Sequence, residues 1–219
     1  MKKGFTLAEV LVTLSIVGVI AILTIPSLVK NYRYKIYSTS IEKAYSQISA
    51  AAKQAMDDDM TNDWYKSTSG AVDDNENCTK GSCYFLNNYF KLARKNCGGT
   101  TSPKCFADKY TNLDGSSGNL PFERGYCAQT VNGMTMCMNI DSEKASTKIA
   151  LDTNGPSQPN IVGLDTFILQ ITADGAVKDW RDDPTLCNGK TSEYNNIADY
   201  ATGCLVKVMR NNWTITDEN

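Results

Sequence analysis

The most constraining feature of this chain is a long apolar run close to its N-terminus. Residues 10–29 contain no charged side chain, whereas Lys2, Lys3 and Glu9 precede them. A helix over residues 5–29 is about 37 Å long, which is enough to cross a hydrocarbon core of about 30 Å. The two lysines favour keeping the N-terminal end in the cytoplasm. We therefore expect a single-pass segment that sends the rest of the chain across the membrane.

Two simpler interpretations of this segment fit its residues poorly. A secretory signal has an apolar region of roughly 7 to 15 residues followed by small residues at its cleavage site, and here the run is longer and lacks such a site. A plain membrane anchor gives no reason for Glu9, because an ionisable group near a bilayer core costs roughly 2.5 to 3.5 kcal/mol. Glu9 therefore needs a partner.

The residues around Glu9 resemble a known processing signal. The stretch Lys3-Gly4-Phe5-Thr6-Leu7-Ala8-Glu9, followed by the apolar run, is similar to the N-terminus of type IV pilins and type II secretion pseudopilins. The resemblance implies that a prepilin peptidase cuts after Gly4 and methylates the new N-terminal Phe5. It also implies that Glu9 pairs with the N-terminal amine of a neighbouring subunit in a filament.

Gly18 and Pro26 interrupt the apolar helix. Pro26 removes one backbone hydrogen bond, so we expect a kink there, and Gly18 lowers the helix propensity. In assembled type IV pili the matching segment is often extended, so the resemblance implies that residues 18–26 unwind during assembly. The alternative is a helix that is merely kinked.

The pattern after Pro26 predicts a helix that enters a globular head. Apolar residues recur at spacings of three and four over residues 30–60, which is typical of an amphipathic continuation of the first helix. Three aspartates at 57–59 disfavour a helix C-terminus, so the helix should end or fray there. This divides the chain into a leader at 1–4, a membrane or filament-core helix at 5–29, an amphipathic continuation at 30–60, and a head at 61–219.

The head has the size of a single domain and its pattern predicts an α+β fold. We expect a short helix over 85–93, and a loop over 100–122 that has room for one turn of helix. Asn132-Gly133 lies between two β-rich runs and is a strong hairpin signal. Further strands are expected at 149–151, at 167–171 and around Val177. A long helix followed by an antiparallel sheet is a pilin-like arrangement.

Eight cysteines in a head expected outside the cytoplasm predict a disulfide framework. Pairing of neighbours along the chain, one of many connectivities, gives Cys78 with Cys83, Cys97 with Cys105, Cys127 with Cys137, and Cys187 with Cys204. The last pair resembles the C-terminal disulfide loop of type IV pilins. Across a two-residue hairpin Cys127 and Cys137 are one residue out of register, so a bulge or a longer loop is needed, or the partners differ. Zinc is disfavoured, because the chain has no histidine and the first pair lacks the zinc-knuckle spacing.

The loop at 151–165 raises the question of a metal. It resembles a sheet loop of pilin-like heads, and oxygens of Asp152, Asn154 and Asp165 are suitable for calcium. The position that would carry the glutamate of an EF-hand is Gly163. We favour a loop built from Asx turns and glycine, which needs no metal, and keep calcium as the alternative.

Enzymatic and nucleic-acid functions find little support. Without histidine there is no Ser-His or Cys-His pair, and oxidised cysteines are unavailable as nucleophiles. The formal net charge is −2, so nothing indicates a basic surface for nucleic acid. We predict no catalytic site and no resident cofactor.

These observations predict a filament subunit. Before assembly it would sit in the inner membrane with its head in the periplasm, and afterwards in an extracellular or periplasmic filament. The resemblance implies partners: copies of itself, other pilin-like subunits, prepilin peptidase, an inner-membrane assembly platform and a cytoplasmic ATPase. Open fates are a pilus subunit for adhesion, motility or DNA uptake, a type II secretion pseudopilin, and a minor tip subunit. An anchored periplasmic binding module that never polymerises is the alternative of another class.

Overall fold

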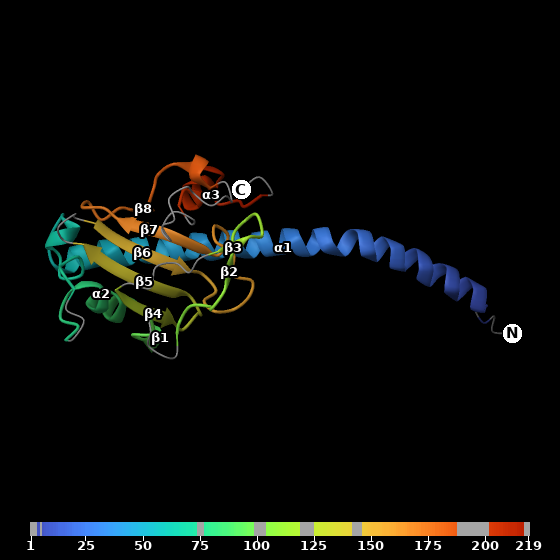
Figure 1. Cartoon of the computed structure of the whole chain (residues 1–219), viewed down its shortest axis with the longest axis horizontal. Helices are drawn as coiled ribbons and strands as arrows, with labels where there is room; N and C mark the ends of the chain where they lie inside the picture. The colour runs from blue at the N-terminus through green and yellow to red at the C-terminus, as the bar shows by residue number, and fades with distance from the viewer. Residues whose placement is uncertain are drawn as a thin grey trace.

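The largest element of the fold is one helix of 52 residues, α1 (Leu7–Asp58). The computed structural model describes residue 4 and residues 6–73, 77–98, 104–118, 125–141, 146–187 and 202–216. Figure 1 shows a head built around one half of α1, while the other half projects from the head and curves gently toward the N-terminus. The helix ends at Asp58 with Asp59 as its C-cap, as the run of aspartates indicated.

The helix runs through Gly18 and Pro26 without a break. Near Pro26, the Thr24 hydroxyl donates to the carbonyl of Ile20 at 2.9 Å and the Ser27 hydroxyl donates to that of Thr24 at 3.0 Å. In the isolated subunit residues 18–26 are thus helical, and their unwinding on assembly stays a prediction.

The head contains a six-stranded antiparallel sheet in the order β1-β4-β5-β6-β7-β8 and a separate two-stranded ribbon, β2-β3. These elements give the α+β, pilin-like architecture that the sequence predicted. The strands are β1 (Leu92–Lys95), β2 (Tyr110–Thr111), β3 (Ser117–Gly118), β4 (Tyr126–Thr130), β5 (Thr135–Asp141), β6 (Ser146–Asp152), β7 (Thr166–Ile171) and β8 (Val177–Asp179). The short helices are α2 (Gly81–Tyr89) and α3 (Cys204–Arg210), with 3-10 turns at Trp64–Lys66 and Pro184–Leu186.

The prediction of a second helix over 85–93 was wrong at its C-terminal end. The chain becomes extended at Phe90, after which Leu92–Lys95 form β1 beside β4. Pairing with β4 satisfies backbone groups at the sheet edge, and this tertiary contact overrides the helical spacing of the side chains. The expected loop at 100–122 also holds structure, because β2 and β3 lie within it.

The four disulfides join the same neighbouring cysteines that chain order suggested: Cys78–Cys83, Cys97–Cys105, Cys127–Cys137 and Cys187–Cys204. The register problem at the third bridge is solved by a three-residue loop, 131–133, since Gln129 faces Thr135 and Cys127 faces Cys137. Gly133 takes a positive φ of 92° in this loop, which a residue with a side chain rarely adopts.

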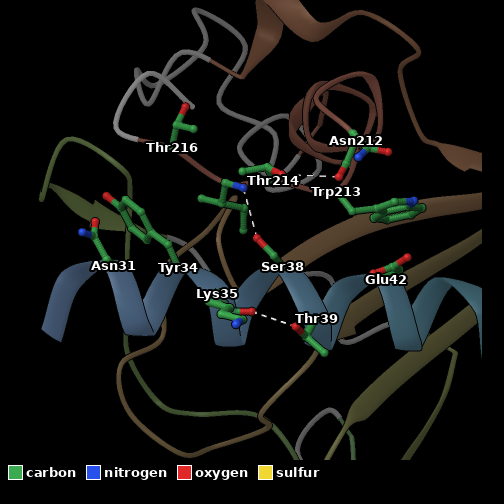
Figure 2. A pocket seen from close by; sticks show the side chains of 11 residues that line it. Asn31, Tyr34, Lys35, Ser38, Thr39, Glu42, Asn212, Trp213, Thr214 and Thr216 are labelled. Carbon is green, nitrogen blue, oxygen red and sulfur yellow. Dashed lines mark hydrogen bonds between the residues drawn. The ribbon is translucent and has the colours of Figure 1, made fainter. Parts of the chain in front are cut away.

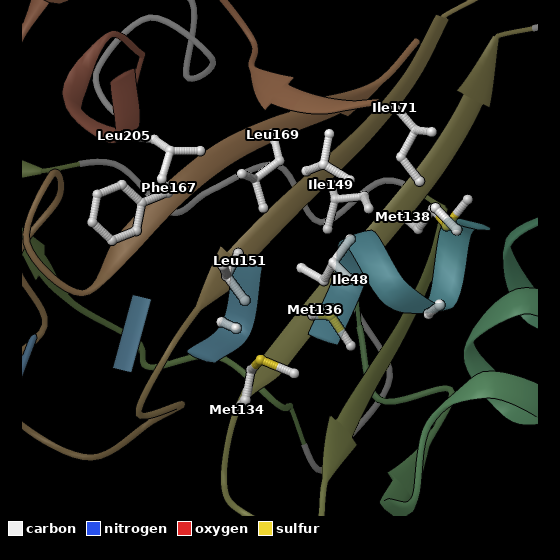
Figure 3. Close-up of a cluster of buried hydrophobic side chains, with 14 of the residues drawn as sticks. Ile48, Met134, Met136, Met138, Ile149, Leu151, Phe167, Leu169, Ile171 and Leu205 are labelled. Atoms are coloured by element: carbon white, nitrogen blue, oxygen red, sulfur yellow. The ribbon is translucent and has the colours of Figure 1, made fainter. Parts of the chain in front are cut away.

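The core lies between α1 and one face of the sheet. Figure 3 shows Ile48 of α1 directed at side chains of β5, β6 and β7, among them Met136, Leu151 and Leu169. These positions alternate along each strand, as expected for a face that packs on a helix. Each such side chain contributes roughly 1.5–3 kcal/mol when fully buried.

The other face of the sheet is covered by residues that follow β1. Cys137, Ala150 and Ile168 lie on this face and form a second buried cluster with Phe106 and Tyr110. The chain segment that carries Phe106 is tied back by the Cys97–Cys105 bridge. The middle of the sheet is therefore buried on both faces.

Candidate functional site

The N-terminal end of α1 is closed by reciprocal hydrogen bonds between Thr6 and Glu9. The Glu9 N–H donates to Thr6 Oγ1 at 3.3 Å, and the Thr6 N–H donates to Glu9 Oε2 at 2.8 Å. The Thr6 hydroxyl donates to the same oxygen at 2.9 Å. This capping box holds the carboxylate over the first turn of the helix, next to the predicted cleavage point. Sequence analysis missed it, although the spacing Thr-x-x-Glu is its signal.

Gly4 is exposed directly before this capped turn. No atom lies within 4 Å of the position that a Cβ on Gly4 would take. Phe5, the predicted methylated residue, lies outside the described part of the chain. The peptide bond predicted to be cut thus begins at an accessible residue, and the roles of both residues stay predictions.

The projecting half of α1 is apolar and exposed. It is the single described helix long and apolar enough to cross a membrane, and its most apolar stretch is 0% buried. Within the described residues no cation forms a salt bridge with Glu9. The exposed side chains of this half include Leu7, Val10, Leu14, Val17, Ile20, Leu23 and Leu28. This surface needs a lipid or protein environment that one subunit does not provide.

Two hollows flank α1 where it enters the head. The larger, about 610 Å³, lies between α1 and the segment after α3. Figure 2 shows its polar walls, with Ser38 facing the end of the chain; the Ile215 N–H donates to Ser38 Oγ at 3.0 Å. Trp213 packs against Tyr45 with ring centroids 5.2 Å apart. This hollow is where the C-terminal segment is fastened to the helix.

The smaller hollow, about 440 Å³, lies on another face of α1. Its walls are Pro26–Tyr37 on the helix, the β2-β3 ribbon, and the segment before β7. Two cations, Lys30 and Arg33, line it together with apolar side chains such as Val29, Leu113 and Ile161. Among the described residues that line it, none carries a carboxylate.

Two of the three predicted calcium residues are buried acids close to each other. Asp152 and Asp165 are both 0% exposed. Burial raises the pKa of Asp152 to about 7, and burial together with the nearby charge of Asp152 raises the pKa of Asp165 to about 8. The Tyr110 hydroxyl donates to Asp152 at 2.6 Å, and the Ile161 N–H donates to Asp165 at 2.8 Å. At neutral pH the raised pKa values favour the protonated form of at least one of the two carboxyl groups.

The oxygens left over at this pair are suitable for a cation. Asp165 Oδ2 and Asn154 Oδ1 are buried and have no hydrogen-bond partner among the described residues. The Asn154 N–H donates to Asp152 at 3.1 Å, which turns the loop in the manner of an Asx turn. No group of three or more His, Cys, Asp or Glu gathers anywhere in the described residues. A calcium ion here would thus take amide and backbone oxygens besides the two carboxylates.

A third buried acid, Asp179, fixes the start of α3 to the sheet. Its carboxylate accepts the N–H groups of Gly203 at 2.8 Å and Leu205 at 2.9 Å at the start of α3, beside the Cys187–Cys204 bridge. Burial raises the pKa of Asp179 to about 6. Sequence analysis missed this residue, because no pattern along the chain links it to α3.

Comparison with known proteins gives two family matches that meet near Pro26. Residues 27–218 match a family described as a family of unknown function, DUF6613. The chain belongs to this family. Residues 1–25 match the prokaryotic N-terminal methylation motif, which makes this DUF6613 protein type IV pilin-like. Neither a curated protein nor a solved structure gives a match.

The boundary between the two matches falls inside the exposed part of α1, because residues 27–33 are still exposed and the first buried residue of the helix is Tyr37. The methylation motif covers most of the capped, exposed half of α1, and the DUF6613 match covers the rest of α1 and the head. The motif points to a structural protein rather than an enzyme and to assembly with pilin-like subunits. Together with the apolar helix it is consistent with anchoring in a membrane before assembly.

Proposed function

We propose that this DUF6613 protein is a structural subunit of a type IV pilus or a related filament, cut after Gly4 and assembled through α1. The observation that supports this most is the projecting half of α1, whose apolar side chains are exposed in the subunit behind a capped Glu9. Each of these side chains contributes roughly 1.5–3 kcal/mol when it is buried. Packing of many such helices into a filament core supplies that burial.

Glu9 gives the assembly its register. Cleavage after Gly4 creates an amine that is largely protonated at neutral pH. An amine of a neighbouring subunit that comes alongside Glu9 pairs with it while both groups leave water, whereas a misplaced subunit leaves both charges unpaired. The capping box holds the Glu9 carboxylate at the end of the helix, where such an amine arrives.

The head is proposed to lie in the periplasm before assembly, where its disulfides form. A prepilin peptidase, an inner-membrane platform and other pilin-like subunits are the proposed partners. A type II secretion pseudopilin and a minor tip subunit are the alternative fates within this class.

The capping box allows a sharp test of the role of Glu9. Glu9→Gln keeps a capping-box side chain and removes the charge, whereas Glu9→Ala removes both. We expect both variants to be inserted and cleaved but to yield no filaments when either is the sole copy, as counted by electron microscopy of sheared surface material. Normal filament numbers with Glu9→Gln would show that capping, not charge pairing, is what Glu9 contributes.

Processing is tested separately by N-terminal mass spectrometry of the assembled protein. The mature chain should begin at an N-methylated Phe5, and Gly4→Leu should block the cut because a bulky side chain replaces the exposed glycine. Assembled material that retains Lys2 or Met1 would contradict the proposed function.

A further inference from the structure

We propose that the larger hollow beside α1 receives the β4-β5 hairpin loop of a second copy of this chain. This inference rests on the proposed filament and adds a contact between neighbouring heads to it. An open filament built from one kind of subunit needs two different surfaces that fit each other, because a contact between two identical patches closes into a dimer. Two surfaces of this kind lie on the two sides of α1 in the head.

The first surface is the larger hollow, of about 610 Å³, and the second is a groove of about 410 Å³. The hollow is lined by α1 residues between Asn31 and Glu42, whereas the groove is lined by α1 residues between Lys43 and Gln54. At 3.6 residues per turn, the two sets lie on either side of the face of α1 that packs on the sheet. They also lie at different levels along α1. A contact between them therefore joins copies that are displaced along the helix, which gives an open helical assembly.

The hairpin loop 131–133 presents an apolar side chain at the rim of the groove. Val131 is 67% exposed, which leaves most of a large apolar side chain in water. Backbone hydrogen bonds hold the loop in one shape: the Gly133 N–H donates to the Thr130 carbonyl at 3.0 Å, and the Thr130 N–H donates to the Met134 carbonyl at 2.8 Å. A loop that is already ordered loses little conformational entropy when it docks.

Two lysines beside this loop supply positive charge. Lys91 precedes β1, and its carbonyl accepts the Val131 N–H at 3.0 Å, so it lies next to the loop. Lys43 lines the same groove from α1, and no salt bridge among the described residues includes either lysine. Asp58 accepts a hydrogen bond from the hydroxyl of the groove residue Tyr89 at 2.9 Å but is not part of the lining. The described residues that line the groove thus carry two positive charges and no negative one.

The hollow has complementary chemistry at one end. Figure 2 shows Trp213 and Glu42 at the same end of it, and no salt bridge among the described residues includes Glu42. Lys35 lines the other end, about 10.5 Å from Glu42 along the helix axis, and so leaves this end negative. A cation that lies over an indole ring and beside a carboxylate is attracted by both. The Lys91 ammonium of a second copy fits here, with its Val131 against the Trp213 ring.

Trp213 is held in the wall of the hollow by an unusual backbone conformation. Asn212 and Trp213 have φ values of 50° and 58°, which are common for asparagine but rare for a bulky residue such as tryptophan. The Trp213 N–H donates to the Val208 carbonyl at 2.9 Å, and the indole packs against Tyr45. Strain of this kind persists only where the surrounding structure imposes it. The wall is therefore in place before a second copy arrives.

The charge pair is tested by exchanging its signs in the full chain. Glu42→Lys and Lys91→Glu should each reduce the number of filaments in sheared surface material roughly tenfold or more, because like charges then meet. The double variant should restore the filaments, since opposite charges meet again. The matched control is Lys95→Glu, at the other end of β1 and outside the groove lining, which should keep wild-type numbers. All three side chains are exposed, so the melting temperature of the head should not change.

A cross-link in wild-type filaments tests the same contact without a substitution. Cells moved into heavy-nitrogen medium during filament growth contain labelled and unlabelled subunits side by side. A carbodiimide joins a carboxylate directly to an amine that it touches. We expect a peptide with Glu42 joined to a peptide with Lys91, one labelled and the other unlabelled, in mass spectra of the digested filaments.

The outcomes separate this inference from the proposed function. Normal filaments with Glu42→Lys, or a double variant as defective as the single ones, would overturn the hairpin contact while leaving filament assembly in place. A Glu42 peptide joined to a different lysine of a second copy, or to another protein, would overturn it as well. Wild-type cells that form no filaments would contradict the proposed function itself, and this contact with it.

Discussion

The two halves of α1 are parts of one continuous helix in opposite surroundings. In the projecting half Ile20 is 56% exposed, and in the half within the head Ile48 is 0% exposed. The inner half confines its apolar residues to one face, which the sheet covers, whereas the outer half is apolar on all sides. A helix that is apolar all round is stable only when something surrounds it, so the outer half is built for an environment outside the subunit.

The largest difference between the halves should appear on truncating one buried and one exposed isoleucine. Ile48→Ala leaves a cavity between α1 and the sheet and should cost about 2–5 kcal/mol of unfolding free energy. Ile20→Ala should leave the stability of the head unchanged. Thermal unfolding of the full chain in detergent micelles, followed by near-UV circular dichroism, measures both. Equal losses of unfolding free energy from the two variants would contradict the view that only the inner half of α1 stabilises the head.

Loss of the disulfides should give the next-largest difference between the two halves of α1. The Cys187–Cys204 bridge spans 17 residues, and its removal by paired serine substitutions should cost about 3 kcal/mol through loop entropy. Removal of Cys78–Cys83, which spans 5 residues, should cost about 2 kcal/mol. Because no cysteine lies in α1, the outer half should stay helical in micelles when the head is reduced and unfolded. Loss of its far-UV signal on reduction would show that it depends on the head.

The buried acid pair makes the head sensitive to pH in a way that the outer half is not. Folding raises the pKa of Asp152 to about 7 and of Asp165 to about 8, from ordinary values near 4. The folded state thus holds protons more tightly than the unfolded state, so this contribution is complete below about pH 4 and is lost as the pH rises through about 7 to 8. Asp165→Asn, which mimics the protonated acid, should lessen the fall in melting temperature from pH 5 to 8.5. An unchanged slope would contradict the raised pKa values.

Calcium is the other proposed way of relieving this pair. If the ion uses Asp152, Asn154 and Asp165, a chelator should lower the melting temperature of the wild-type head. The free energy of unfolding should fall by roughly 2.7 kcal/mol when calcium was present at 100 times its dissociation constant. The effect should be larger at pH 8 than at pH 6, since calcium requires the ionised carboxylates. Asp165→Asn is the control and should not respond. An unchanged melting temperature in the wild type would favour the interpretation that the loop at 151–165 is built from Asx turns and glycine without a metal.

The smallest expected effect concerns the start of the outer half. Thr6→Ala removes the N-cap and should cost about 1 kcal/mol, seen as faster amide exchange in the first turn of α1 in micelles. Because Glu9 keeps its charge, this variant should still assemble. Loss of filaments with Thr6→Ala would show that the capping geometry, and not only the charge, is needed.

Sequence reasoning succeeded where the determinants are local and failed where they are not. The end of α1 near residue 58 and the hairpin around Gly133 depend on neighbouring residues, and both were predictable. Strand β1 depends on pairing with β4, which lies some thirty residues further along the chain. The spacing of apolar side chains in this segment is that of a helix and was therefore misleading. The capping box was readable from Thr6 and Glu9 but was overlooked. The burial of Asp165 and the attachment of Asp179 to α3 follow from tertiary packing, and no short pattern contains them.

The short span of every disulfide has a mechanical consequence. The bridges join cysteines separated by 5, 8, 10 and 17 residues, and all lie beyond α1. In the proposed filament the subunits are held together through α1, so a pulling force would reach the head through the apolar contacts between α1 and the sheet, which no disulfide reinforces. If those contacts yield, the chain between the bridges extends while each bridged loop stays closed. The bridged loops would therefore limit how far the subunit lengthens under tension.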